Sequence, residues 1–141
     1  MSLYQVVMRL ARNPGHPDGD GGHGYIVVAP LDAADYLDPK EWRHCRADCT
    51  VVRFKPGHPH DADGWLAHNG THWFFHYDEP EEGEDEPVFR LGDHRLAIGD
   101  YVTIHEGGGE SLTYRITQRT PFRPPAHSAG GGKRVTRENV K

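Results

Sequence analysis

The fold is decided by residues 65–77, which read Trp65-Leu66-Ala67-His68-Asn69-Gly70-Thr71-His72-Trp73-Phe74-Phe75-His76-Tyr77. Asn69-Gly70 is the strongest short-range signal for a two-residue hairpin turn, because both residue types tolerate the positive φ that such a turn needs. This turn would pair His68 with Thr71. Side chains alternate between the faces of a strand, so we predict that the more apolar set faces the core. That set is Leu66, His68, Thr71, Trp73, Phe75 and Tyr77.

Short strand-like segments occupy much of the remaining chain. Runs rich in β-branched and aromatic residues at 3–10, 25–29, 50–54, 101–105 and 112–117 predict strands. Gly92-Asp93 suits the turn of a second hairpin, with strands at 89–91 and 94–96 and with Arg90 opposite Arg95. The turn of a third hairpin is expected at 107–109. These features predict an all-β fold with one short helix, as a small antiparallel β-barrel or β-sandwich.

The helix is expected to begin after Asp38. Asp38 can cap its N-terminus, Pro39 suits the first helical position, and Glu41 completes a capping box. A looser helical turn is expected to precede it, at residues 32–36. Trp42 from this helix would then cover the less apolar face of the first hairpin.

The 141 residues fit a single domain, but their charge is uneven. Residues 121–141 hold five basic residues and one acidic residue, so this Pro/Gly-rich segment carries +4 and residues 1–120 carry −9 of the net charge of −5. Too few apolar residues lie in 121–141 to offset the entropy of ordering, which predicts a flexible basic tail. Residues 78–86 form an acidic run that we expect to be a solvated loop within the domain 1–120.

Hydropathy and leader patterns indicate where the protein works. No apolar run approaches the roughly 18 residues of a membrane span, and no basic start is followed by a hydrophobic segment. We therefore expect a cytoplasmic protein with no membrane partner.

Residues 89–117 carry a family resemblance. The segment FRLGDHRLAIGDYVTIHEGGGESLTYRIT places a Gly-acid turn before a Val-x-Ile strand and returns to an aromatic-bearing strand. It resembles the C-terminal hairpin of small, uncharacterised bacterial β-proteins. The residues 2–5, 13–14 and 46–50 resemble the same group. The resemblance implies a β fold and names no activity, and the Gly-Asp-x-Val-x-Ile element also recurs as a structural turn in small barrels.

Eleven histidines raise the question of metal binding. His72 and His76 lie roughly 13 Å apart along a strand, at ~3.3 Å per residue, which is too far for one zinc ion with bonds of about 2 Å. Two loops are better candidates, because their histidines and carboxylates are closely spaced. The candidate ligands are His16, Asp18, Asp20 and His23 in one loop and His58, His60, Asp61 and Asp63 in the other. No cofactor is required by these patterns, and zinc is the metal that they would suit.

The remaining nucleophiles and thiols point to no catalytic residue. No serine lies in a G-x-S-x-G turn, and no phosphate-binding glycine loop precedes a helix. Cys45 and Cys49 are spaced C-x₃-C, whereas structural zinc sites use C-x₂-C or C-x₄-C together with a second such unit. Two buried thiols are therefore expected, and a zinc site completed by two outside histidines is the alternative.

A surface patch gives a third kind of candidate. Directly opposed like charges such as Arg90 and Arg95 destabilise a hairpin, so we expect the acidic run to offset them or an anion to bind there. The binding patch comprises Trp65, His72, Phe74, His76, Arg90 and Arg95.

Three functions stay open at this point. The first is a non-enzymatic binding or interaction module for an unknown protein or small ligand. The second is a divalent-metal-binding protein or metalloenzyme that uses the loops 16–23 and 58–63. The third is a nucleic-acid-binding barrel aided by the basic tail, against which the −9 body argues, because it repels phosphates.

Overall fold

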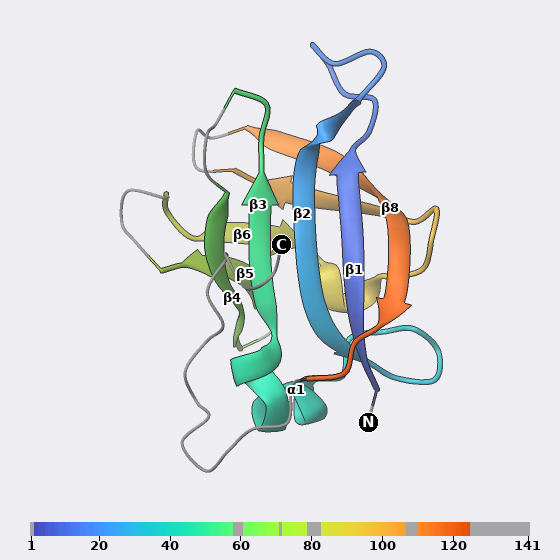
Figure 1. Cartoon of the computed structure of the whole chain (residues 1–141), viewed down its shortest axis with the longest axis vertical. Coiled ribbons are helices and arrows are strands. Elements are labelled where there is room, and N and C mark those ends of the chain that lie inside the picture. Colours follow the sequence, from blue (N-terminus) through green and yellow to red (C-terminus); the bar gives the residue numbers. More distant parts are fainter. Residues whose placement is uncertain (1, 58–60, 71, 79–82, 107–109, 125–141) are drawn as a thin grey trace.

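The structure is a computed structural model that describes residues 2–57, 61–70, 72–78, 83–106 and 110–124. Eight antiparallel strands form a closed barrel in which each strand pairs with the next and the last closes onto the first (Figure 1). The strands are β1 Ser2–Leu10, β2 Asp20–Leu31, β3 Thr50–Phe54, β4 Ala62–Asn69, β5 His72–Tyr77, β6 Glu86–Phe89, β7 Tyr101–His105 and β8 Ser111–Pro121. The all-β prediction is confirmed, and the architecture is the barrel rather than the sandwich.

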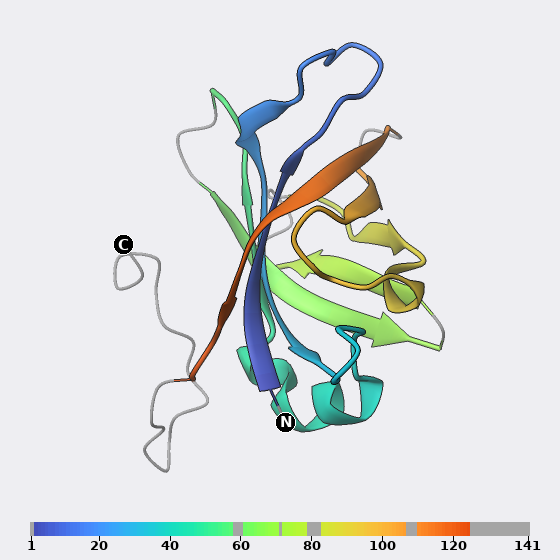
Figure 2. The ribbon, with the colours of Figure 1, turned by 90° about the vertical axis from the view of Figure 1, so that its right-hand side faces the viewer.

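The two ends of this barrel are built differently. Because successive strands run in opposite directions, alternate connections fall at opposite ends. The loop end carries the connections 11–19, 55–61, 78–85 and 106–110. The helical end carries the connections 32–49, 70–71 and 90–100, which contain the helix α1 Pro39–Cys45 and the 3-10 turns η1 Arg46–Asp48 and η3 Leu91–Asp93. Figure 2 shows α1 beside the start of β1, at the end opposite the β1–β2 connection.

Large side chains fill the middle of the barrel. In a barrel of eight strands the interior is just wide enough for side chains to occupy it. Register places Val6 opposite Val27, and Met8 opposite Tyr25, on the inward face. The largest fully buried side chains are Tyr25, Tyr114, Phe75, Met8, Leu66, Ile104 and Ile116. The described residues thus pack into one continuous core along the lumen.

The first hairpin has the predicted faces but not the predicted register. Asn69 pairs with His72 and Leu66 with Phe75, so the pairing is displaced by one residue on each strand. A displacement of one residue on both strands keeps the same side chains on each face. Leu66, Trp73, Phe75 and Tyr77 are accordingly buried, whereas Thr71 lies outside the described residues. Asn69 remains in β4, and the first turn residue is Gly70, which has a left-handed φ of +65°.

The second hairpin was predicted wrongly. β6 ends at Phe89, Arg90 adopts a left-handed φ of 50°, and η3 follows in place of a strand. β6 pairs with β7 through Val88 and Ile104, so Arg90 and Arg95 never oppose each other. The physical reason is burial: leaving the strand lets Leu91 and Leu96 enter the core, at 2% exposure each. The third hairpin, β7 with β8, is confirmed, and its turn at 107–109 lies outside the described residues.

The helix begins where its sequence predicts. The Asp38 side chain accepts hydrogen bonds from the backbone N–H groups of Lys40 and Glu41. The Asp38 N–H itself donates to the Pro30 carbonyl, so the second half of the expected capping box is replaced by a bond to β2. The preceding residues 32–36 form a turn around the Asp32 carboxylate, which accepts from the Ala34 and Tyr36 N–H groups, rather than a helical turn.

Aromatic side chains close the helical end. Trp42 donates its indole N–H to the Leu66 carbonyl at 2.9 Å. Its ring lies edge-on to Trp73 and His68, which stack on each other with centroids 4.2 Å apart. Burial, followed by the charges of Arg43 and His72, lowers the pKa of His68. Trp42 therefore packs against the inward set of the first hairpin, and not on the face bearing Trp65 and Phe74 as predicted.

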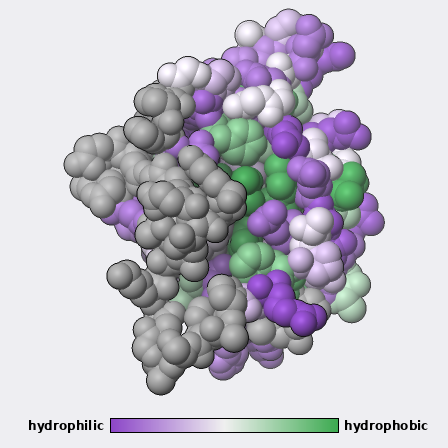
Figure 3. Space-filling model, in the orientation of Figure 1, coloured by the Kyte–Doolittle hydropathy of each residue, from purple (hydrophilic) through white to green (hydrophobic). Residues whose placement is uncertain are grey.

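The outer surface of β1 and β2 bears a smaller apolar group. Figure 3 shows apolar side chains near the centre of this face, with hydrophilic residues above and to the right of them. By register, Val7 pairs with Ile26 and Val28 with Gln5; Val7 and Val28 are buried and Ile26 is half-buried. Among the described residues, α1 is the one α-helix, and no helix is long and apolar enough to cross a membrane.

Candidate functional site

A buried polar cluster lies inside the barrel at the loop end. Each of its side chains continues the inward-facing series of a strand: His23 and Tyr25 on β2, Arg53 and Lys55 on and after β3, and Glu106 directly after β7. The whole cluster comprises His23, Tyr25, Arg53, Lys55, Tyr77, Glu86, Glu106 and Tyr114. The strands that contribute to it surround the lumen, so the cluster spans the barrel mouth.

Glu86 is the inner carboxylate of this cluster. Its side chain is 1% exposed, and Arg53 donates to its Oε2 at 2.9 Å. The hydroxyls of Tyr25 and Tyr77 both donate to its Oε1, the former at 3.0 Å. A buried carboxylate is stable only when such partners replace its hydration. Glu86 is also the last acid of the run 78–86, so that run ends inside the barrel and not in the expected solvated loop.

Glu106 is the outer carboxylate. Lys55 donates to its Oε1 at 3.1 Å, while the hydroxyls of Tyr114 and Tyr25 donate to its Oε2, the latter at 3.2 Å. His23 hydrogen-bonds the Tyr114 hydroxyl at 3.0 Å. Burial by itself would raise the pKa of Glu106, but its interactions with His23, Tyr114 and Lys55 outweigh burial and lower the pKa to about 2. Glu106 is therefore an anion throughout the neutral range.

The three tyrosines act as hydrogen-bond donors. Burial, together with the neighbouring carboxylates, raises the pKa of Tyr25, Tyr77 and Tyr114 far above the usual value of 10. A phenol has one proton to donate: that of Tyr77 is directed at Glu86, that of Tyr114 at Glu106, and that of Tyr25 is shared between the two carboxylates. The cluster thus contains two carboxyl groups, one guanidinium group, one amine and three hydroxyl donors besides His23. None of the tyrosines can serve as a general base near neutral pH.

The surroundings of the cluster are strongly acidic. Apart from the cluster members Glu106 and Lys55, the described residues of the four loop-end connections include six acidic residues and one basic residue. The three connections of the helical end hold seven acidic residues and five basic ones. Because like charges at one end of a domain reinforce one another, the loop end attracts cations and repels anions.

The predicted metal loops lie at the same end of the barrel, since both 11–19 and 55–61 are loop-end connections. His23 is directed into the cluster, at 8% exposure, and Asp20 accepts from the Gly22 N–H. His16 is half-buried, Asp18 is exposed, and Asp61 and Asp63 are half-buried, while His58 and His60 lie outside the described residues. Within the part of the chain that the structure describes, no three His, Cys, Asp or Glu side chains are grouped to hold a metal ion.

The thiols form a close pair at the helical end. Cys45 and Cys49 are both free and buried, with their sulfur atoms 3.8 Å apart. Burial raises the pKa of both thiols. Two buried thiols were predicted, and no described histidine completes a zinc site with them.

The predicted binding patch is divided between the two ends. Trp65 and His76 are cross-strand partners whose side chains hydrogen-bond the acidic residues Asp78 and Asp85, at 2.7 and 2.6 Å. On β5, which also carries His76, Phe74 is half-buried and His72 is exposed. Arg90 and Arg95 belong to the helical end, where they pair with Asp93 and Asp100. The six residues therefore form no single patch.

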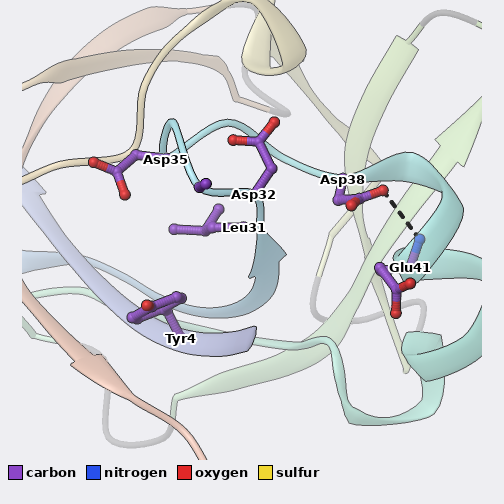
Figure 4. Close-up of a pocket in the computed structure, with 7 residues that line it drawn as sticks. Tyr4, Leu31, Asp32, Asp35, Asp38 and Glu41 are labelled. Carbon is purple, nitrogen blue, oxygen red and sulfur yellow. Dashed lines mark hydrogen bonds between the residues drawn. The ribbon is translucent and has the colours of Figure 1, made fainter. Parts of the chain in front are cut away.

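A pocket at the helical end is lined by carboxylates. Figure 4 shows Asp32, Asp35, Asp38 and Glu41 around it, with Tyr4 and Leu31 from the neighbouring strands. The three aspartates already have structural partners. Asp35 pairs with Arg119 at 2.7 Å, Asp38 caps α1, and Asp32 holds the turn described above.

Sequence reasoning missed most of the cluster. The sequence did contain a signal for it, because Glu106 continues the every-second-residue series of Val102 and Ile104. Lys55 continues the series of Val51 and Arg53 in the same way. Polar residues that continue an apolar inward series indicate a polar plug at a barrel end. No protein-family model, curated protein or solved structure matches this chain, so the resemblance of residues 89–117 gains no support.

Proposed function

We propose that this protein is a non-enzymatic binding module whose loop end takes a positively charged protein partner. The observation that carries the proposal is the acidity of the loop-end connections around the anionic Glu106, whose described residues, apart from Glu106 and Lys55, include six acidic residues and one basic residue. Long-range attraction of this kind accelerates encounter and selects the sign of the partner's charge.

The interior supports a surface partner over a ligand held within the lumen. Tyr25, Phe75 and Tyr114 are fully buried and occupy the middle of the barrel. Both cluster carboxylates accept hydrogen bonds from side chains of the protein itself. Groups that are satisfied in this way hold the barrel mouth in shape, so the first contact of a partner falls on the acidic connections. We place the protein in the cytoplasm, where the thiols of Cys45 and Cys49 stay reduced.

Binding of polylysine to the full chain tests this proposal, with polyglutamate and a single-stranded oligonucleotide as polyanion probes. We expect polylysine to bind and its affinity to fall between 20 and 300 mM NaCl, because the Debye length shortens over this range from roughly 20 Å to roughly 6 Å. Binding of the oligonucleotide without polylysine would instead favour the nucleic-acid function.

Two matched double variants locate the surface. Glu84→Gln with Glu110→Gln removes two exposed loop-end charges, and Glu41→Gln with Asp93→Asn removes two charges at the helical end. At low salt we expect the first variant to bind polylysine roughly five-fold more weakly, at a few tenths to 1 kcal/mol per charge. The second should bind like the wild type. Equal weakening in both variants would refute a loop-end site.

A further inference from the structure

The ion pair of Lys55 with Glu106 crosses the barrel mouth. Lys55 follows β3 and Glu106 follows β7, which stand four places apart in a closed order of eight strands and so on opposite walls. The Nζ–Oε1 distance is 3.1 Å. The Lys55 side chain is 26% exposed and that of Glu106 only 8%, so Lys55 is the partner more accessible to solvent.

The two oxygens of Glu106 have different environments. Oε2 accepts from the hydroxyls of Tyr114 and Tyr25, which are buried in the lumen. His23 lies 3.8 Å from the same oxygen. Oε1 accepts from Lys55. If Lys55 moves away, the Tyr114 and Tyr25 hydroxyls still hold the Glu106 carboxylate through Oε2. Oε1 then becomes available as an acceptor for another cation.

This asymmetry determines which cation fits. A guanidinium group binds a carboxylate best through two parallel hydrogen bonds, one to each oxygen. At Glu106 the tyrosine hydroxyls already occupy Oε2, so only one oxygen is available to a newcomer. A primary ammonium group is a compact point charge that needs one oxygen, and Lys55 shows that such a group fits.

We propose that Glu106 is an acceptor site for a primary ammonium group, which Lys55 occupies in the free protein as an internal competitor for a lysine side chain of the partner. That the ammonium group belongs to a protein partner rests on the proposed function, whereas the ammonium site itself does not. The acidic connections around the mouth would concentrate lysine-rich segments, and the exchange at Glu106 would distinguish lysine from arginine.

The test removes the Lys55 side chain by substitution and adds a small molecule that carries the same primary ammonium group. Thermal unfolding of the full-length Lys55→Ala variant is measured in n-butylammonium chloride, n-butylguanidinium chloride and sodium chloride at equal ionic strength. A ligand that binds only the folded state raises the melting temperature. We expect butylammonium to raise that of Lys55→Ala by a few degrees over sodium, and butylguanidinium to raise it less. The wild type should not discriminate among the three salts.

Two controls assign the effect to this site. Lys55→Ala combined with Glu106→Gln should lose the preference for butylammonium, and Lys40→Ala, at an exposed lysine of α1, should behave like the wild type. Equal effects of the three salts on Lys55→Ala would overturn the proposal. If that variant does not fold, Lys55→Met keeps the aliphatic stem and carries the same test. Folding of either variant in butylammonium alone supports the site, and failure in every salt overturns it.

Polylysine binding separates this inference from the proposed function. Lys55→Ala should bind polylysine several-fold more tightly than the wild type, because the internal competitor is gone. An ammonium effect without polylysine binding would retain the site and reject the partner class. Polylysine binding without an ammonium effect would retain the proposed function and reject the site.

Discussion

The loop end and the helical end close one barrel by opposite physical means. At the loop end, Glu86 and Glu106 are surrounded by cations and hydroxyls. At the helical end, Trp42, Leu91 and Leu96 are buried in the core. A polar network is stable only when every member is satisfied, whereas an apolar closure depends on filled volume. The comparison indicates that the loop end is the more sensitive to single substitutions and the one suited to exchange partners.

The largest effect should come from the inner carboxylate. Glu86→Ala removes the buried carboxylate to which Arg53 donates, and with it the acceptor of the Tyr25 and Tyr77 hydroxyls. Breaking one side of a buried ion pair costs about 3–5 kcal/mol. Urea unfolding at pH 7 measures the loss, with the exposed Glu84→Ala as a control expected within about 0.5 kcal/mol of the wild type. A loss of stability no larger than that of Glu84→Ala would contradict the claim that the polar network stabilises the loop end.

The outer carboxylate should make stability depend on pH. The pKa of Glu106 is lowered from 4.5 to about 2 in the folded state. A carboxyl group whose pKa is lowered on folding stabilises the folded state at pH values above its unfolded pKa, and this stabilisation is lost as the pH falls to the folded pKa. For Glu106 the contribution to the free energy of unfolding amounts to roughly 3 kcal/mol at most. Unfolding of the wild type and Glu106→Gln at several pH values tests this. The stability difference should be full above pH 5 and shrink towards pH 2, and a constant difference would contradict the prediction.

The smallest of these effects is expected at the helical end. Trp42→Phe keeps a buried aromatic ring but removes the N–H that donates to the Leu66 carbonyl. A buried acceptor left without its donor costs about 1–3 kcal/mol. Urea unfolding at pH 7 measures the loss, which we expect to stay below that of Glu86→Ala because the substitution leaves every ion pair intact. A loss as large as that of Glu86→Ala would remove the distinction between the two ends.

Local sequence patterns predicted the strands of this barrel well. Alternation in 65–77 identified the inward set Leu66, Trp73, Phe75 and Tyr77, because a buried face imposes a period of two. Asp38 and Pro39 located the start of α1 through capping chemistry that depends on neighbouring residues alone. The turn of the first hairpin was displaced by one residue, since Asn-Gly fixes the place of a turn less firmly than packing does.

Contacts between distant segments could not be predicted in this way. Leu91 and Leu96 leave a predicted hairpin because core burial outweighs local turn preference. His23 was a candidate metal ligand because of its neighbours in sequence, whereas its hydrogen bond to Tyr114, 91 residues away, could be seen only in the barrel. Lys55 and Glu106 are 51 residues apart and meet because their strands stand on opposite walls of a closed barrel.

The sequence by itself determined the all-β class, the inward faces, the helix start and the uneven charge, because these depend on periodicity, capping and composition. The tertiary structure alone decided that the barrel closes, which connections share an end and which carboxylates are buried with partners. Closure follows from pairing between β1 and β8, a long-range contact that no local pattern specifies. The candidate site exists only as a consequence of that closure, which brings residues from five strands to one mouth together with Glu106, directly after a sixth strand.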